Sequence, residues 1–174
     1  MRGFTLPDLL VVTGLVAAFL VLGLPGLGTL KGNLATSVEQ HRLLSLLTAA
    51  RSAAIHGNRR TVLCPFDDEQ PGPDCGPGIG AGWLLFADLN GDRQYRPDED
   101  ELLRLERIPR ARALRVRDRG GDAFDSALTF RPDGSVVTPA TLNLCAAGSR
   151  RTVRVVVSMT GRVRTEREQV PCAT

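Results

Sequence analysis

The chain has almost no lysine, and it lacks the residue patterns on which most enzymes depend. Of its 22 basic residues, 21 are arginine and only Lys31 is lysine. A GC-rich genome explains this bias first, although guanidinium groups also suit forked contacts with phosphate or carboxylate. No nucleophile elbow, phosphate-binding loop or zinc motif is present. We therefore expect no enzymatic activity, no catalytic residue, no metal and no cofactor.

The longest apolar stretch lies at the N-terminus, from Phe4 to Leu24. As a helix it would be about 31 Å long, which matches the hydrocarbon core of a bilayer. It contains one ionisable residue, Asp8, and a carboxylate kept at such a cost is expected to have a function. A secretory signal peptide would have a shorter apolar region followed by its cleavage site. A plain membrane anchor would not explain the ordered residues Gly3-Phe4-Thr5-Leu6-Pro7-Asp8-Leu9-Leu10.

These residues resemble the class III signal of type IV pilins and type II secretion pseudopilins. The resemblance implies that a prepilin peptidase cleaves after Gly3 and methylates the new N-terminal residue, Phe4. It also implies that Asp8, at a position where the family usually has glutamate, pairs with the N-terminus of a neighbouring subunit during assembly. The expected partners are this peptidase, other major and minor pilins, and the inner membrane before assembly.

The chain as a whole predicts an α+β fold, with one long helix packed on an antiparallel β domain. We expect a leader at residues 1–3, a transmembrane helix at 4–30 and a globular domain at 31–174. Pro25 should bend the helix. The apolar periodicity predicts that the second half of the helix packs on the domain through Leu34, Val38, Leu44, Leu47 and Ile55.

After Asn58 the pattern changes to short strand-like runs that are separated by turn residues. We predict strands at residues 61–64, 83–87, 101–105, 114–116, 127–130, 142–145, 153–158 and 162–165. Four cysteines in a translocated domain suggest two disulfides, and no C-x-x-C pair suggests a metal site. Three pairings are possible, and we favour the two local ones, Cys64–Cys75 and Cys145–Cys172.

Residues 82–92 and 128–134 are similar to the FimT and GspH branch of minor pilins and pseudopilins, and the resemblance covers nearly the full length. It implies a single-pass inner-membrane protein before assembly, and a location in the pilus or periplasm and at the cell surface after assembly. The segment Asp88–Asp92 also begins like a calcium loop, but Arg93 stands where such a loop has glycine. A hairpin turn at Asn90-Gly91 explains the same residues, and both interpretations stay open.

Arginines gather in the C-terminal segment, where residues 148–174 contain six arginines and two glutamates. Arg162 and Arg164 would lie about 7 Å apart on one face of a strand, close to the spacing of successive phosphates. With Gly161 they match the G-R-x-R sequence of DNA-binding FimT-type minor pilins. The resemblance thus implies non-specific DNA binding during natural transformation, and charge and proximity add Arg150, Arg151, Arg154 and Arg167.

The alternative function is a structural minor pseudopilin of the GspH kind, which serves a type II secretion system without binding DNA. In that case Gly161, Arg162 and Arg164 serve only as parts of a turn and a strand of the fold.

Overall fold

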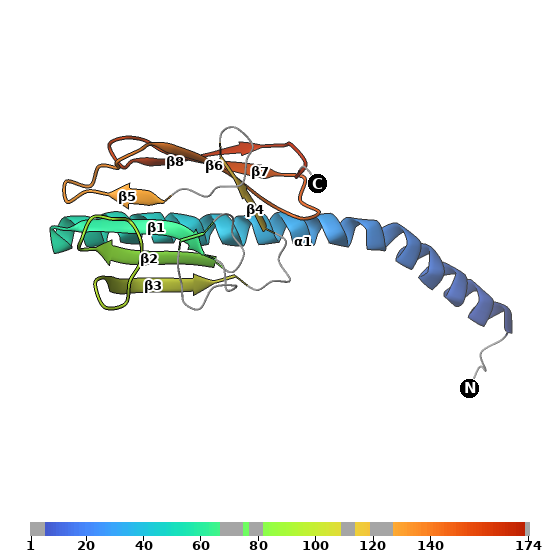
Figure 1. The fold of residues 1–174 in the computed structure, drawn as a ribbon. Coiled ribbons are helices and arrows are strands. Elements are labelled where there is room, and N and C mark those ends of the chain that lie inside the picture. The colour runs from blue at the N-terminus through green and yellow to red at the C-terminus, as the bar shows by residue number, and fades with distance from the viewer. Residues whose placement is uncertain (1–5, 67–74, 77–81, 109–113, 119–126, 173–174) are drawn as a thin grey trace.

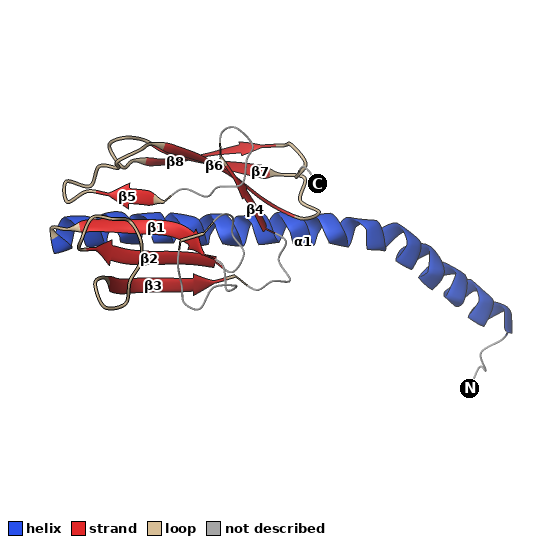
Figure 2. Cartoon of the chain, viewed as in Figure 1, coloured by secondary structure: helices blue, strands red, loops and turns tan. Residues whose placement is uncertain are grey.

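The computed structural model describes residues 6–66, 75–76, 82–108, 114–118 and 127–172. Within these residues the chain forms one helix, α1 (Leu6–Gly57), followed by strands that are all paired antiparallel. Figures 1 and 2 show α1 lying along the β domain, while its N-terminal part curves away and extends beyond it. The predicted α+β architecture is confirmed.

The strands form two four-stranded sheets rather than one. The first sheet has the order β3-β2-β1-β5 and the second has the order β4-β6-β7-β8. The first consists of β1 (Arg60–Phe66), β2 (Gly82–Asp88), β3 (Glu101–Arg107) and β5 (Leu128–Phe130). The second consists of β4 (Leu114–Arg117), β6 (Ala140–Ala146), β7 (Thr152–Val157) and β8 (Val163–Glu168).

The helix α1 runs without a break through Pro25 and ends where the sequence predicts, at Gly57. Asn58 follows with a left-handed backbone, at φ 47°. The N–H of Arg59 donates to the carbonyl oxygen of Ala54 at 3.2 Å, which satisfies one of the last carbonyl groups of the helix. This turn sends the chain directly into β1.

The face of α1 that packs on the sheets differs from the predicted one. Leu34, Val38 and Ile55 are exposed, whereas Leu47 is buried as expected. Leu44 is partly buried and also packs against the core. The prediction was wrong for the three exposed residues because apolar residues occur on more than one side of this helix, and helical spacing alone does not tell which side the sheets cover. The covered side also carries small and polar side chains. It consists of Thr36, Glu39, Gln40, Leu43, Leu46, Leu47, Ala50 and Ala54.

Two buried hydrogen bonds attach the helix to the sheets. The hydroxyl of Thr61 in β1 donates to the carbonyl oxygen of Ala50 at 2.8 Å. The hydroxyl of Thr36 accepts the N–H of Ala146 in β6 at 3.1 Å. Around these contacts, one core joins α1 to the inner faces of both sheets, and it includes Trp83, Leu85, Phe130, Leu142, Leu144, Val153, Val155 and Val157.

Both disulfides have the pairing that the sequence favours. Cys64 is bonded to Cys75 with the Cα atoms 5.5 Å apart, and Cys145 is bonded to Cys172 with the Cα atoms 5.6 Å apart. Cys64 lies in a second apolar cluster on the outer face of the first sheet. The other bond fixes the segment that follows β8 to the end of β6.

Candidate nucleic-acid interface

The strands β7 and β8 form a hairpin, and its turn carries Gly161 and Arg162. The N–H of Gly161 donates to the carbonyl oxygen of Ser158 at 2.8 Å, and the N–H of Ser158 donates to that of Arg162 at 3.0 Å. Gly161 has φ 71°, and a Cβ atom there would overlap the carbonyl oxygen of Gly134. The turn therefore requires glycine, whatever the adjacent arginines bind.

Arg162 and Arg164 lie on the outer face of the second sheet. Arg164 is paired with Val156, and the hydrogen bond between Ser158 and Arg162 continues this ladder by one residue. Strand β8 thus begins one residue later than predicted, but Arg162 remains in register. Side chains two residues apart in such a ladder share a face, and both arginines are exposed.

The two glutamates of β8 are paired with another arginine. Arg154 in β7 lies 3.6 Å from Glu166 and 2.8 Å from Glu168, measured between nitrogen and oxygen atoms. Within the described residues, Arg162 and Arg164 form no ion pair. Arg154 shares their face of the sheet, but its charge is offset by these carboxylates.

The other predicted arginines lie elsewhere. The backbone N–H of Arg150 donates to the Asn33 side chain at 3.2 Å, which places Arg150 and Arg151 at the far end of β7, beside the helix. Arg167 is paired with Val153, whose side chain belongs to the core, so Arg167 projects from the opposite face to Arg164. The structure therefore brings together only two of the predicted arginines without compensating carboxylates.

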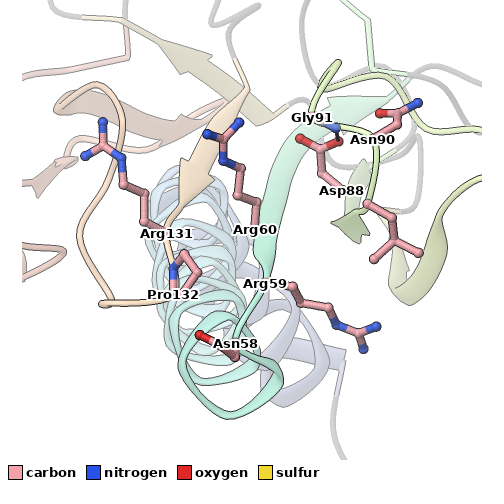
Figure 3. A pocket seen from close by; sticks show the side chains of 9 residues that line it. Asn58, Arg59, Arg60, Asp88, Asn90, Gly91, Arg131 and Pro132 are labelled. Atoms are coloured by element: carbon pink, nitrogen blue, oxygen red, sulfur yellow. Dashed lines mark hydrogen bonds between the residues drawn. The ribbon is translucent and has the colours of Figure 1, made fainter.

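Two arginines that the sequence analysis did not single out lie at the same end of the molecule as Arg162. Arg60 and Arg131 line a pocket of about 500 Å³. Figure 3 shows these side chains beside the C-terminal end of α1. Sequence reasoning missed them because they are 71 positions apart and meet only through the pairing of β1 with β5. The pocket, here called the tip pocket, is lined by Asn58, Arg59, Arg60, Asp88, Leu89, Asn90, Gly91, Arg131 and Pro132.

The segment with the calcium-like spacing forms part of the connection from β2 to β3. Asp88, Asn90 and Asp92 each accept a backbone N–H from two or three residues further along the chain, at 2.8 to 3.0 Å. Asp92 also pairs with Arg96 at 2.8 Å. In the described part of the chain, no group of three or more histidine, cysteine, aspartate or glutamate residues is placed to hold a metal ion.

The N-terminal part of α1 exposes a large apolar surface. Leu6 and Phe19 are among its most exposed side chains, at 75% and 76%. Asp8 lies in the first turn of the helix, whereas Gly3 and Phe4 lie outside the described residues. Among the described residues, the structure contains no helix whose length and hydropathy suffice to cross a membrane.

Comparison with known proteins identifies the family. The sequence model of the family described as type II transport protein GspH matches residues 39–161. The chain belongs to this family of type IV minor pilins and pseudopilins. The pilin-like protein PilA1 of Thermus thermophilus is 34% identical to it over 167 residues, which cover 95% of this chain and 98% of PilA1.

A solved minor-pilin structure shares the fold of this chain. The type IV minor pilin FimU of Pseudomonas aeruginosa has a TM-score of 0.51 at 22% identity, covering 72% of this chain and 88% of FimU. The minor pseudopilin EpsH of the type II secretion system of Vibrio cholerae has a TM-score of 0.46 at 16% identity, covering 75% of this chain and 95% of EpsH. Members of the family are structural proteins that assemble with other pilins in a pilus or in the periplasm.

Proposed function

We propose that this minor pilin is incorporated into a type IV pilus and binds DNA non-specifically through Arg162 and Arg164, for DNA uptake in natural transformation. The observation that carries the proposal is the pair of exposed guanidinium groups on one face of the β7–β8 hairpin, while the glutamates of β8 pair with Arg154. Guanidinium groups contact phosphates without reading bases, so the binding is electrostatic and indifferent to sequence.

Processing and assembly belong to the same proposal. A prepilin peptidase cleaves the chain after Gly3 and methylates Phe4, and Asp8 then pairs with the N-terminus of a neighbouring subunit. Before assembly the apolar part of α1 is held in the inner membrane, and afterwards it is held among the helices of other pilins. The exposed apolar side chains of residues 6–19 support this proposal, because such a surface is stable only when it is covered.

A structural pseudopilin of a type II secretion system is the second candidate. The contact of Gly161 with Gly134 favours it, because this contact explains the glycine of the G-R-x-R sequence without a ligand. The two candidates therefore differ in the assembly that takes up the subunit and in what the arginines do.

A mobility-shift titration of the full chain in detergent, repeated over a range of salt concentrations, separates the candidates. The logarithm of the binding constant should fall with the logarithm of the salt concentration, with a slope of about 0.9 per phosphate contact. The double variant R162Q/R164Q should lose most of the binding, and its slope should decrease by the amount expected for about two phosphate contacts. The matched control R150Q/R151Q removes the same charge at the far end of β7 and should keep the wild-type slope.

Two outcomes would contradict DNA binding through these arginines. One is a wild-type chain that shifts no DNA at low salt, which would favour the structural pseudopilin. The other is an equal loss of slope in R162Q/R164Q and R150Q/R151Q, because this would mean that only the net charge matters.

Processing is tested separately by mass spectrometry of the chain from its host. The mature N-terminus should be a methylated Phe4, and the variant Gly3→Leu should accumulate as an uncleaved precursor in the inner membrane. A normally cleaved Gly3→Leu chain would contradict the predicted role of Gly3.

A further inference from the structure

Three charged residues form one row at the end of the first sheet. Arg60 in β1 is paired with Asp88 in β2, and the register that pairs Thr61 with Phe130 places Arg131 on the other side of Arg60. Thr61 and Phe130 face the helix, so the neighbouring residues Arg60 and Arg131 project from the outer face of the sheet. Figure 3 shows the two arginine side chains side by side and pointing the same way.

From this row we infer that the tip pocket is a second phosphate site, in which Arg60 and Arg131 together hold one backbone phosphate of the DNA that contacts Arg162. The inference rests on the proposed function and extends it from the β7–β8 hairpin to the first sheet. It replaces Arg150, Arg151 and Arg167, which lie away from Arg162, with two arginines from β1 and the end of β5.

The guanidinium groups of the row are available to an anion. Arg131 is held in place because its Nη1 donates to the hydroxyl of Ser135 at 3.3 Å and to the carbonyl oxygen of Val136 at 3.2 Å. Within the described residues, the side chain of Arg60 makes no hydrogen bond and no ion pair. The protein thus already orients the guanidinium of Arg131, which lowers the entropy cost of a two-arginine grip, whereas the side chain of Arg60 becomes ordered only when the ligand binds.

The charges around the pocket favour an anion over a cation. Arg59 is paired with Glu101 and points away from the other two arginines in Figure 3, so it takes no part. Asp88 is the single carboxylate among the lining residues, and it is only 3% exposed. Its Oδ1 atom accepts the N–H of Gly91 at 2.8 Å, whereas its buried Oδ2 atom has no hydrogen-bond partner.

Asp88 therefore acts against the phosphate in this arrangement. Its charge repels an anion in the pocket and attracts the guanidinium of Arg60, which competes with the ligand. Removal of this charge should strengthen the binding of phosphate. That sign is useful in a test, because loss of a purely structural residue would weaken binding instead.

The pocket and the β7–β8 hairpin are neighbours at one end of the molecule. The turn that follows Arg131 packs on the hairpin turn, since the N–H of Val136 donates to the carbonyl oxygen of Met159 at 2.9 Å and Gly134 touches Gly161. A nucleic-acid backbone that contacts Arg162 can therefore continue over the same tip to Arg131 and Arg60.

The test is the same salt-dependent titration of the full chain in detergent, now with the double variant R60Q/R131Q. The single variants R60Q and R59Q form a matched pair, because each removes one charge from adjacent positions of the chain. We expect R60Q/R131Q to reduce the slope by about 0.9, corresponding to one shared phosphate, while R59Q keeps the wild-type slope. D88N retains an oxygen that accepts the N–H of Gly91, and it should bind DNA several-fold more tightly. Thermal unfolding, followed through the single tryptophan, checks that each variant is folded.

The outcomes separate this inference from the proposed function. If R162Q/R164Q loses slope and R60Q/R131Q does not, DNA binding stands and the tip pocket is not a phosphate site. If the wild type binds no DNA, both proposals fail. A titration with inorganic phosphate alone, followed through the Nε–H signals of the arginines, identifies the other source of the ligand: signals that shift at Arg60 and Arg131 without DNA binding would assign the pocket to free phosphate and overturn the nucleic-acid assignment.

Discussion

Gly161 lies directly against Gly134, so that a side chain at Gly161 would overlap the carbonyl oxygen of its neighbour. The backbone of Gly161 is also left-handed, at φ 71°. The variant Gly161→Ala should therefore lower the free energy of unfolding by about 2 kcal/mol or more, from backbone strain and displacement of the adjacent turn. Unfolding in urea, followed by the fluorescence of the buried Trp83, measures this loss.

Gly14→Ala is the matched control for this prediction, because a Cβ atom at Gly14 would have no neighbour within 4 Å. An equal stability of Gly161→Ala and the wild type would contradict the tight contact. A Gly161 variant that loses both stability and DNA binding does not show what the arginines bind, so DNA binding is tested with the arginine variants.

The covered face of α1 provides the second prediction. Leu47 is fully buried against both sheets, whereas Leu34 is 58% exposed. Leu47→Ala should lower the free energy of unfolding by about 3 kcal/mol, from lost burial and the cavity that remains. Leu34→Ala should change it by less than about 0.5 kcal/mol in the isolated chain. Urea unfolding of both variants measures the two values, and a larger effect at Leu34 would mean that the helix packs in another rotation.

The elements of this fold could be predicted from the sequence because their signals are local. Turn residues such as Gly134 and Gly161 separate the strands, and Asn58 marks the end of the helix. The relations between elements could not be predicted in the same way. Nothing in the short runs around Leu63 and Leu128 indicates that they pair with each other, because register depends on the whole packed sheet.

The residues of the candidate site also differ in whether a local signal in the sequence reveals them. Arg162 and Arg164 were found because they are two residues apart on one strand. Arg60 and Arg131 were missed because their proximity exists only after β1 pairs with β5. The compensation of Arg154 by Glu166 and Glu168 likewise depends on the register between β7 and β8, so net charge over the segment overestimated the number of available arginines.

The third prediction concerns the disulfide between Cys145 and Cys172, which closes a loop with a sequence separation of 27. The double variant C145A/C172A should lower the free energy of unfolding by about 3 kcal/mol, mainly because the unfolded chain gains freedom. The comparison of its urea midpoint with that of the oxidised wild type measures this change. The wild type in reducing agent, which also opens the Cys64–Cys75 bond, should be at least as unstable, and a more stable reduced wild type would contradict the assignment.

The fourth prediction concerns Asp133, in the turn between Arg131 and Gly134. The hydroxyl of Ser135 donates to its Oδ1 atom at 2.6 Å, and the N–H of Ser135 donates to the same atom at 2.8 Å. These two hydrogen bonds, the hydroxyl first, hold the pKa of the Asp133 carboxyl below its ordinary value. An NMR titration of the side-chain carboxyl carbon should therefore give a midpoint lower than that of an unperturbed aspartate.

The direction of this pKa shift fixes the effect of Asp133 on stability. Because the folded state holds the proton less tightly than the unfolded state, the ionised carboxyl contributes stability above the ordinary pKa of aspartate. This contribution is lost as the pH falls through the lowered pKa of the folded state.

The variant Ser135→Ala tests the cause of the shift, because it removes the hydroxyl but keeps the backbone N–H. It should raise the titration midpoint of Asp133 part of the way towards the ordinary value. The control is Ser158→Ala, because the hydroxyl of Ser158 donates to the carbonyl oxygen of Arg162 instead, and this variant should leave the midpoint unchanged. A Ser135→Ala midpoint equal to that of the wild type would show that the hydroxyl of Ser135 does not stabilise the carboxylate.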